Sequence, residues 1–567
     1  MHQPSSTPRP SIYYRYEVFE PWLPAQHPAP TRQKVAIVGA GPAGMVTALE
    51  LARHGVPSVL LSAERQFSQG SRAICFTRRS MEILQQIGVA DRMAANGLPW
   101  RFGNSFYRGE RVFRMEAPHG EDERFFPILN LQQQYMEEYL HDACQAHPLI
   151  DVRWGNQVLA VTQHGDHAAL RIDTPEGEYG LEADWVVDAS GGRSAIRSAM
   201  DLQMEGASYE GFFVICDLRI DLPLPTERLA FFDPEWNPGN TVLMHREPHG
   251  IWRVDYQLPA GETPEQALRP ESMAARINAQ LASIGLGGTP WEMDWSSVYS
   301  ARTLTLPDFV HGRVIFTGDA AHLLPIFGVR GANTAFQDAQ SLGWQLAFVV
   351  KGLAGPALLA NHSAERVGAA REIIAEGGKS TRFMTPPSPG FRLLRNAVLS
   401  LSLTQDFVRP LYHWRTSRPH EYSHSALNSP GDDDGLFTDG PAHGAPPRNV
   451  RLGADDFLLD HLGGVHGAGF DLLYFTEAGS LPAALCEVLA AARGRGVPIR
   501  VTAIGAAQPV AGADATLADA DGRVRRRYGV PASGAAYLLR PDQHVCARWL
   551  TLDATRLQAA LNQALPQ

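Results

Sequence analysis

The feature that most constrains the fold is a glycine cluster at residues 39–44, Gly-Ala-Gly-Pro-Ala-Gly, which directly follows a short apolar run at residues 35–38. Apolar residues at helical spacing continue to residue 53, and a second apolar run follows at residues 59–61. This strand, turn, helix and strand order begins a parallel sheet. In a G-x-G-x-x-G turn, the glycines allow a tight bend, a close approach of pyrophosphate and close helix packing. The sequence therefore predicts a dinucleotide site that includes Gly39, Gly41, Ala43 and Gly44.

A carboxylate that binds the ribose is expected about 20 residues after such a turn. Ser62 ends the second strand and Glu64 follows two residues later, so Glu64 is the candidate. The alternative is a solvated surface glutamate.

A second cofactor segment lies far along the chain, where Gly-Asp-Ala-Ala-His at residues 318–322 follows another short strand. An acidic side chain at a strand end can accept a hydrogen bond from a ribityl hydroxyl, and the N–H groups of the next helix can face the flavin. This pattern predicts Asp319, Gly331, Ala332 and Asn333 at the cofactor. Asn333 also suits a simple helix cap, and His322 is either a packed side chain or a chemical one.

Between these segments, residues 205–300 contain short β-rich runs separated by Pro, Gly and Asn. They predict an antiparallel sheet inserted into a discontinuous nucleotide-binding domain. Period-two alternation places Trp252 and Tyr256 on one face of their strand, and Arg253 and Asp255 on the other.

Taken together, the glycine turn, the Gly-Asp-Ala-Ala-His segment and the Pro-x-x-Gly-x-x-x-x-Asn turn from Pro325 to Asn333 resemble the flavoprotein aromatic hydroxylases. This group contains para-hydroxybenzoate hydroxylase, phenol hydroxylase and 3-(3-hydroxyphenyl)propionate hydroxylase, and the propionate hydroxylase branch looks most similar. The likeness spans about residues 34–400. It implies tightly bound FAD, with Arg72, Gln133 and Pro325 also at the cofactor, and NAD(P)H as a transient co-substrate. It also implies a glutathione-reductase-like, Rossmann-like domain in an α/β fold.

One segment departs from the family pattern. Where these hydroxylases usually carry an Asp-Gly pair, this chain has Ser190-Gly191, and Asp188 stands two places earlier. The serine keeps hydrogen bonding but loses the charge, which puts the NAD(P)H contacts in doubt more than the flavin. Arg193 is a candidate contact, with a surface arginine as the alternative.

The resemblance implies hydroxylation of a phenolic or related ring with O2, through a flavin C4a-hydroperoxide. Such a ring needs an apolar slot with a few polar groups. The candidate lining residues on the inserted sheet, each with a core role as its alternative, are Tyr209, Phe213, Met244, Trp252 and Tyr256. Arg253, Asp255 and His245 are candidates to orient or deprotonate the substrate, and the catalytic base stays unassigned.

The predicted domain order is an arm (1–33), the first FAD-binding part (34–204), the inserted substrate sheet (205–300), the second FAD-binding part (301–355), a helical segment (356–428), a linker (429–447) and a small domain (448–567). This last domain resembles the thioredoxin-like appendage of phenol hydroxylase. It lacks C-x-x-C, so a structural or dimerisation role is expected.

Composition limits the partners. A net charge of -10 without a long Lys/Arg run argues against nucleic acid. Five single cysteines, with no metal-ligand spacing, favour a reduced, cytoplasmic protein that binds no metal. With no apolar stretch near 20 residues, no membrane span is expected. The expected partners are a small aromatic substrate, O2 and a second copy in a homodimer.

Two rival functions stay open. One is an FAD-dependent reductase, dehydrogenase or halogenase of the same superfold, although the Trp-x-Trp-x-Ile-Pro segment of halogenases is absent from the sequence. The other is a non-catalytic flavoprotein that binds aromatic compounds.

Overall fold

The computed structural model describes residues 4–27, 32–325, 327–412, 419–463 and 468–567. A mostly parallel sheet has β1 (Gln33–Val38) near its centre, between β2 (Ser58–Leu61) and β11 (Gly177–Asp188). β8 (Ile150–Arg153) pairs with β2, and β18 (Val314–Phe316) pairs with β11. Because β18 comes from a distant part of the chain, two separated segments build one sheet, as the sequence led us to expect.

Smaller strands complete this region. A hairpin arm of the sheet is formed by β9 (Gln157–Gln163) and β10 (Ala168–Thr174), and β17 (Val310–His311) pairs with β18 at the other edge. A separate three-stranded sheet consists of β3 (Cys75–Thr77), β7 (Ile128–Asn130) and β4 (Leu98–Trp100).

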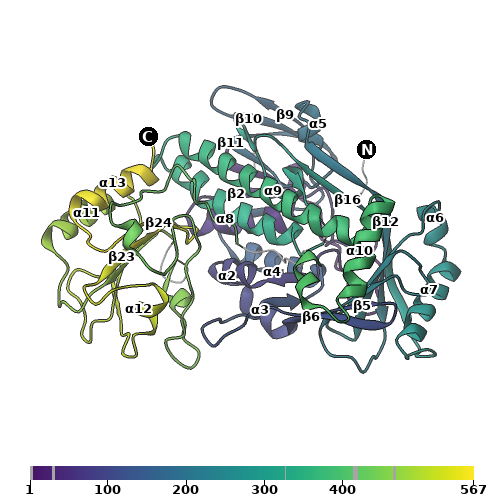
Figure 1. Ribbon diagram of the computed structural model, residues 1–567. Helices are drawn as coiled ribbons and strands as arrows, with labels where there is room; N and C mark the ends of the chain where they lie inside the picture. Colours follow the sequence, from purple (N-terminus) through teal and green to yellow (C-terminus); the bar gives the residue numbers. More distant parts are fainter. Residues whose placement is uncertain (1–3, 28–31, 326, 413–418, 464–467) are drawn as a thin grey trace.

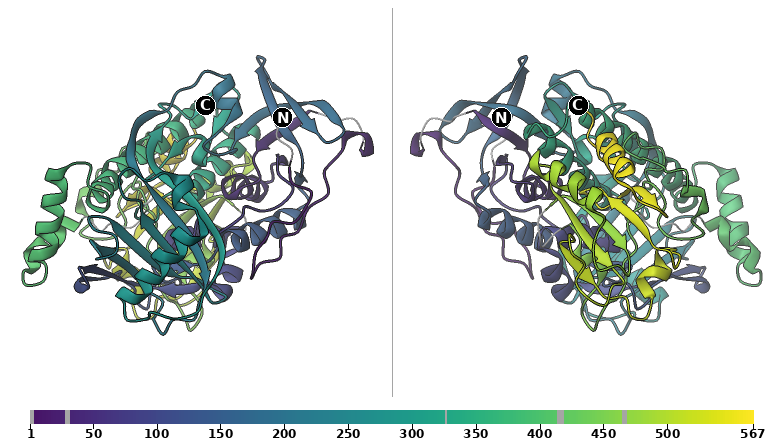
Figure 2. Two further views of the ribbon diagram at one scale, coloured as in Figure 1. Left: turned by 90° about the vertical axis from the view of Figure 1, so that its right-hand side faces the viewer. Right: turned by 90° about the vertical axis from the view of Figure 1, so that its left-hand side faces the viewer.

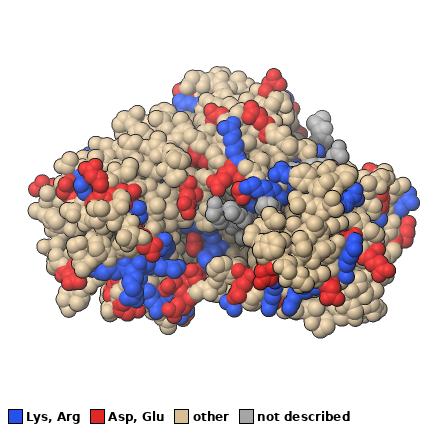
Figure 3. Space-filling model, in the orientation of Figure 1, with Lys and Arg blue, Asp and Glu red and all other residues tan. Residues whose placement is uncertain are grey.

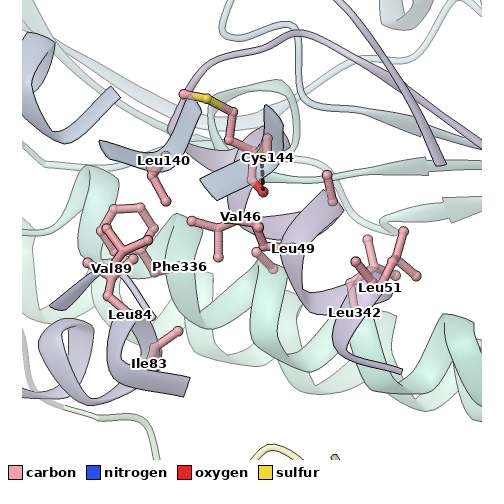
Figure 4. Packing of buried hydrophobic residues seen from close by; sticks show 14 of the residues in the cluster. Val46, Leu49, Leu51, Ile83, Leu84, Val89, Leu140, Cys144, Phe336 and Leu342 are labelled. Atoms are coloured by element: carbon pink, nitrogen blue, oxygen red, sulfur yellow. Dashed lines mark hydrogen bonds between the residues drawn. The ribbon is translucent and has the colours of Figure 1, made fainter. Parts of the chain in front are cut away.

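Several helices bury a common apolar core beside the parallel sheet: α1 (Pro42–Arg53), α2 (Arg78–Gln86), α3 (Ala90–Asn96), α4 (Gln133–Ala146) and α8 (Gly331–Val350). Figure 4 shows Val46, Leu140 and Phe336 meeting between α1, α4 and α8. Each such side chain contributes about 1.5–3 kcal/mol when it is fully removed from water. This core fixes the positions of the α1 and α8 N-termini, which both line one cavity.

The second large sheet is mostly antiparallel, in the order β19-β16-β12-β15-β14-β13-β5-β6. Its strands are β5 (Phe102–Tyr107), β6 (Glu110–Glu116), β12 (Glu205–Arg219), β13 (Arg228–Phe232), β14 (Thr241–Arg246), β15 (Ile251–Gln257), β16 (Glu292–Thr305) and β19 (His322–Leu323). The sheet is wider than the predicted insertion, since β5 and β6 come from upstream and β5 pairs in parallel with β13. Their short alternating runs gave no sign of a distant partner.

The two faces of this sheet have different neighbours. One face packs against α7 (Pro270–Ser283), preceded by α6 (Pro264–Ala267), and encloses an apolar cluster that includes Trp252 and Tyr256. The other face looks toward the parallel sheet, so the space between the two sheets is where a ligand can be held.

Further helical segments follow α8: α9 (Ala357–Met384), α10 (Pro389–Leu401) and the short 3-10 helix η3 (Asp406–Tyr412). In Figure 2 the α10 region stands away from the main body. The small helix α5 (Ala195–Ala199) lies beside β9.

The C-terminal region forms a five-stranded sheet in the order β22-β21-β20-β23-β24 (Figure 1, at the left). Its elements are β20 (Phe470–Phe475), α11 (Ala483–Gly494), β21 (Ile499–Ile504), β22 (Ala515–Leu517), α12 (Arg523–Arg527), β23 (Ala535–Leu539), β24 (Val545–Trp549) and α13 (Ala554–Ala564). Trp344 and Phe348 of α8 enter its apolar core. The region is therefore packed onto the helix that leads to the cofactor site.

The N-terminal arm lies over the body through aromatic packing. Tyr14 and Tyr16 are buried with Phe67 and Trp154, and the Phe19 ring stacks on Trp154 with centroids 4.4 Å apart. These rings fix the arm along residues 62–70.

Charges are interspersed over the face in Figure 3, with a basic group over α12. Arg523 and Arg527 of that helix pair with Asp122 and Glu123 at 3.4 and 2.9 Å. Within the described ranges, no helix is both long and apolar enough to cross a bilayer.

Candidate active site

A cavity of about 1140 Å³ runs from the glycine turn after β1 to the inner face of the antiparallel sheet. It is lined by the ends of β1, β2 and β11, by the start of α8 and by strands β12 to β16. The site therefore lies outside the carboxyl ends of parallel strands, where α/β sheets usually bind ligands.

The three glycines of the turn are used in different ways. Gly39 has a φ of +107°, and a Cβ there would lie 2.5 Å from the Ala189 carbonyl oxygen. A Cβ on Gly44 would lie 1.9 Å from the Gly39 oxygen. A Cβ on Gly41 would meet no described atom within 4 Å, because it would point into the cavity. Gly39 and Gly44 are thus needed for backbone packing, and Gly41 leaves the turn open to the cavity.

Two helix N-termini face the cavity. α1 starts after Gly41 and α8 starts after Arg330, and among the described residues no N-cap side chain bonds to either first turn. Their N–H groups are therefore available to anionic or electron-rich ligand atoms. This arrangement fits a pyrophosphate at α1 and a flavin edge at α8.

Glu64 lines the cavity beyond the end of β2. Its separation from the glycine turn along the sequence is the one expected of a residue that binds the ribose. Arg9 of the N-terminal arm forms an ion pair with it at 2.9 Å. The Arg9 N–H also donates to Gln66 at 2.9 Å. The arm therefore holds the carboxylate of Glu64, a contact that the sequence did not reveal.

Residues 68–75 form one wall of the cavity and are tied to α4. Gln133 accepts a hydrogen bond from the Ala73 N–H at 3.0 Å and donates to Glu137 at 2.7 Å. Glu137 in turn accepts from the Ser68 N–H at 2.7 Å. Arg72 and Gln133 both line the cavity.

The second cofactor segment reaches the cavity as expected. Asp319 lines it with an exposed side chain directly after β18. His322 points away, and its Nε2 lies 2.6 Å from Asp338, which also pairs with Arg366 at 2.6 Å. The geometry assigns His322 to packing of this turn, which settles the alternative left by the sequence.

The turn before α8 is held by its own side chains. Val329 lines the cavity with a φ of +62°, which is strained for a β-branched residue. Asn333 accepts from the Thr77 N–H at 2.8 Å and donates to the Cys75 carbonyl at 2.9 Å. Asn333 is inside the helix and does not cap it, so its side chain joins α8 to β3 beside the cavity.

Ten of the twelve predicted cofactor residues line this one cavity. They are Gly39, Gly41, Ala43, Glu64, Arg72, Gln133, Asp319, Gly331, Ala332 and Asn333. The other two stand behind it: Gly44 packs on Gly39, and Pro325 packs on Gly377 of α9. Both act by supporting the backbone that faces the ligand.

The unusual Ser190 segment is also explained. Asp188 is fully buried, accepts from the Ser190 N–H at 2.9 Å and from the Ser194 hydroxyl, and so closes its own turn. It does not take the place of the missing aspartate. Ser190 and Arg193 line the cavity, and Arg193 is exposed.

On the sheet side of the cavity, a few polar side chains lie beside apolar ones. Ile215 and Leu243 flank Asp255 in the strand register, and His245 flanks Arg253. Arg228 and Tyr299 come from neighbouring strands and line the same space. An apolar slot with a few placed polar groups suits a small aromatic ligand.

This placement corrects the prediction of which residues line the substrate slot. Met244, Trp252 and Tyr256 belong to the cluster against α7, on the opposite face of the sheet. Phe213 is on the cavity side, but it packs behind Tyr299 and Phe327 at 5.6 and 5.3 Å. The side chain of Tyr209 lies outside the described part of the chain. Alternation separated the two faces correctly, but it could not tell which face α7 covers.

A buried network joins the sheet to the cofactor wall. Arg253 lies 3.3 Å from Asp217, donates to the Arg72 carbonyl at 3.3 Å and to the Ser71 hydroxyl at 2.9 Å. Ser71 also donates to Glu247 at 3.1 Å. Breaking one partner of such a buried charge cluster typically costs about 3–5 kcal/mol. Arg253 is thus committed to positioning residues 71–72.

The electrostatics single out Asp255 and His245. Burial raises the pKa of Asp255 to about 7, partly offset by Arg253. Burial, with Arg228 and Arg253 nearby, lowers the pKa of His245 well below its ordinary value, so its imidazole is neutral. Asp255 Oδ1 and His245 Nδ1 are buried without a hydrogen-bond partner among the described residues. Such atoms can form a hydrogen bond with a ligand or with water.

Sequence reasoning missed Arg228, Tyr299 and Trp295 as lining residues. Tyr299 and Trp295 alternate along β16 with the same period as Arg253 and Asp255 on β15. The alternation along β16 could therefore have been read from the sequence. Only the pairing of β12 with both β15 and β16 shows that their cavity-facing residues lie on the same face of the sheet.

Comparisons with known proteins agree with this geometry. The family model described as "FAD binding domain" matches residues 32–376. A 3-(3-hydroxy-phenyl)propionate/3-hydroxycinnamic acid hydroxylase of Paraburkholderia xenovorans (strain LB400) is 30% identical over 60% of this chain and 54% of its own length. The hydroxylase of the same name from Mycolicibacterium smegmatis (strain ATCC 700084 / mc(2)155) is 29% identical over 78% of this chain and 77% of its own.

A solved structure has the same fold. The flavin-dependent monooxygenase PieE, in complex with FAD and substrate, superposes with a TM-score of 0.79 at 24% identity, over 95% of this chain and all of that one. The family match covers more than half of this chain and includes both cofactor segments. The chain therefore belongs to the FAD binding domain family, and within it to the flavoprotein aromatic hydroxylases, a group of FAD-dependent monooxygenases.

Proposed function

We propose that this protein hydroxylates a phenolic or related aromatic compound, using tightly held FAD, NAD(P)H and O2. One observation carries the proposal: a single cavity extends from the glycine turn to a sheet face on which Asp255 and His245 have buried atoms without a hydrogen-bond partner among the described residues. The curated relatives named above are hydroxylases of phenolic acids, which supports the same substrate class.

The residues present fit FAD. Gly41 and the N-terminus of α1 suit the pyrophosphate, Glu64 the ribose, Asp319 the ribityl chain, and the N-terminus of α8 the ring system. Bound there, FAD would supply the hydride acceptance and the oxygen-transfer chemistry that hydroxylation of a ring by O2 requires. The protein's task is to hold the ring there without water.

Asp255 is the proposed base. A carboxylate whose pKa lies near 7 can take the phenol proton at working pH, which raises the electron density of the ring. Once Asp255 has taken that proton, the neutral His245 donates its ring N–H to the substrate oxygen and orients it, while Ile215 and Leu243 give the slot its apolar walls. Tyr299, and not Phe213 as the sequence suggested, supplies the aromatic side chain that lines the slot.

Several finer expectations remain part of this proposal. NAD(P)H binds transiently at the open side of the cavity, where Arg193 is exposed. The C-terminal region is thioredoxin-like, which the sheet order β21-β20-β23-β24 supports, and it has a structural role. The protein is cytoplasmic and forms a homodimer.

The deciding experiment uses the purified yellow protein. NADH and NADPH oxidation is followed with a panel of phenols and phenolic acids, together with O2 uptake and mass analysis of products formed under ¹⁸O2. We expect substrate-stimulated oxidation and one labelled oxygen in the ring. Nicotinamide oxidation without labelled product would show a reductase, and binding without turnover would show an aromatic-binding flavoprotein; either result rejects the proposal.

A further inference from the structure

The N-terminal arm makes specific polar contacts with residues that line the cavity. The Nη2 of Arg9 lies 2.9 Å from the carboxylate of Glu64, and its Nη1 donates to the Phe67 carbonyl. The Arg9 N–H donates to Gln66 at 2.9 Å, and Gln66 donates to the Thr7 carbonyl at 3.0 Å. Glu64, Gln66 and Phe67 all line the cavity. The arm is therefore attached to the residues at the ribose end of the proposed cofactor site.

Tyr16 of the arm supports the next part of the same wall. Its hydroxyl donates to the Ser68 carbonyl at 3.2 Å and accepts from the Gly70 N–H at 3.2 Å. Ser68 lines the cavity, and its own N–H donates to Glu137 of α4 at 2.7 Å. Residues 66–70 are thus held by both α4 and the arm, and a shift of this segment would break contacts with both.

The arm also reaches the antiparallel sheet. The Ser11 hydroxyl and the Ile12 N–H donate to Asp294 of β16 at 2.7 and 2.6 Å. The next residue of that strand, Trp295, lines the cavity. A Cβ on Gly70 would collide with the Trp295 ring, so the wall that the arm supports is in direct contact with this sheet. The arm therefore joins the two parts of the molecule between which the cavity lies.

The attachment of the arm does not depend on Arg9. Tyr16 is buried, and the Trp22 N–H donates to the Trp154 carbonyl at 2.9 Å. The side chains of Arg9 and Glu64 are 22% and 38% exposed, and ion pairs near the surface contribute little to the stability of a fold. Removing the charge of Arg9 should therefore leave the fold intact and change how the carboxylate of Glu64 is held.

These contacts give the arm a role in holding the cofactor. We propose that Arg9 is a positioning residue for FAD: it fixes the carboxylate of Glu64, which accepts the ribose hydroxyls, and so slows the release of FAD. A carboxylate that is already oriented loses less conformational freedom when the ligand binds, and this strengthens binding. The inference rests on the cofactor site of the proposed function and adds a residue that lies outside both cofactor segments.

The test compares FAD release from the unaltered full-length protein, Arg9→Gln and Arg9→Lys. Each loaded protein is diluted, and free flavin is followed by the rise of its fluorescence. We expect FAD to leave Arg9→Gln about three to ten times faster, the effect of losing one partly exposed charged contact. Arg9→Lys keeps the charge but lacks the planar fork that bonds to Glu64 and Phe67 together, so its rate should be intermediate.

The matched control is Arg15→Gln, because Arg15 lies on the same arm and is exposed. Its rate of FAD release should equal that of the unaltered protein. The melting temperatures of the FAD-free forms should agree within about 2 °C, since no buried group is removed. A larger fall confined to Arg9→Gln would assign Arg9 to folding and refute its positioning role.

A double-mutant cycle tests whether Arg9 acts through Glu64. Arg9→Gln should speed FAD release in the unaltered background and have no further effect in the Glu64→Gln background. Unchanged release from Arg9→Gln, or the same acceleration in both backgrounds, would overturn the proposal.

The outcome is separable from that of the proposed function, because FAD release is measured without turnover. A protein that holds FAD but hydroxylates no phenol would reject only the proposed function, and the release rates would still decide the role of Arg9. A folded protein that takes up no FAD would reject both.

Discussion

At the scale of single residues, the active site depends on how one strand divides its side chains. β15 sends Trp252 and Tyr256 to the α7 core and presents Arg253 and Asp255 to the cavity. Arg253 is occupied by Asp217 and Ser71, which leaves Asp255 as the carboxylate that can meet a substrate from this strand. Burial both raises its pKa and makes it useful as a base near neutrality.

We predict that Asp255→Asn lowers the rate of ring hydroxylation by about 10²–10⁴-fold, the range typical of a general base, while FAD binding is unchanged. The pKa of Asp255 is raised to about 7. The carboxylate is therefore protonated and inactive as a base below that pH, and kcat/KM should rise as pH increases through 7. This rise of kcat/KM with pH should be absent in Asp255→Asn.

The measurement is kcat/KM for labelled product between about pH 5.5 and 9, beside Glu292→Gln as a control on the outer part of the same sheet. The Glu292 side chain is 61% exposed, so its profile should match the unaltered protein. A preserved acid limb in Asp255→Asn would rule this residue out as the base.

At the scale of elements, the turn between β1 and α1 does two separable jobs. Gly44 brings the helix against the turn, and Gly41 keeps the turn open to the cavity. Substitutions at the two positions should therefore have different effects on folding and on cofactor binding.

We predict that Gly41→Ala leaves the melting temperature of the FAD-free protein within about 2 °C, because its Cβ meets no described atom within 4 Å. FAD affinity should fall at least tenfold, since that space is needed by the pyrophosphate. Gly44→Ala should destabilise the FAD-free protein by about 1–3 kcal/mol, because its Cβ would lie 1.9 Å from the Gly39 oxygen.

Thermal melts without FAD and fluorescence titrations with FAD separate the two effects. Equal FAD affinity in Gly41→Ala and the unaltered protein would contradict the assignment of the pyrophosphate to this turn.

Much of the cofactor half was predictable because its signals are local. A glycine turn and a Gly-Asp strand end each occupy a few consecutive residues, so ten of the twelve residues could be placed at one cavity before any contact was known. The substrate half depends on long-range pairing. β5 joins β13 in parallel from far upstream, and Tyr299 reaches Asp255 only through β12. No local pattern encodes such neighbours, nor the pairing of Arg9 with Glu64.

At the scale of the whole molecule, buried charges join the C-terminal region to the FAD-binding part. Arg540 pairs with Glu365 of α9 at 2.6 Å and with Asp542 at 2.6 Å. Asp542 accepts from the Trp344 indole of α8 at 3.0 Å. These contacts fix the orientation of the two parts more narrowly than apolar packing alone would.

We predict that Glu365→Gln destabilises the protein by about 3 kcal/mol, because it leaves the fully buried Arg540 with one carboxylate. Glu178→Gln is the contrast: it breaks a surface pair with Arg171 at 3.0 Å and should cost about 0.5 kcal/mol or less. Urea unfolding of the FAD-loaded forms measures both. Similar losses in the two variants would refute the structural role given to the buried pair.

The split cofactor site has a consequence for synthesis on the ribosome. Asp319 and the start of α8 emerge long after the glycine turn, and α8 completes its packing only when Trp344 and Phe348 meet the strands that follow residue 470. During most of translation, the nascent chain therefore contains only the first of the two segments that form the cofactor site. Flavin capture should be among the last events of biogenesis, and prematurely terminated chains should stay colourless even where free FAD is abundant.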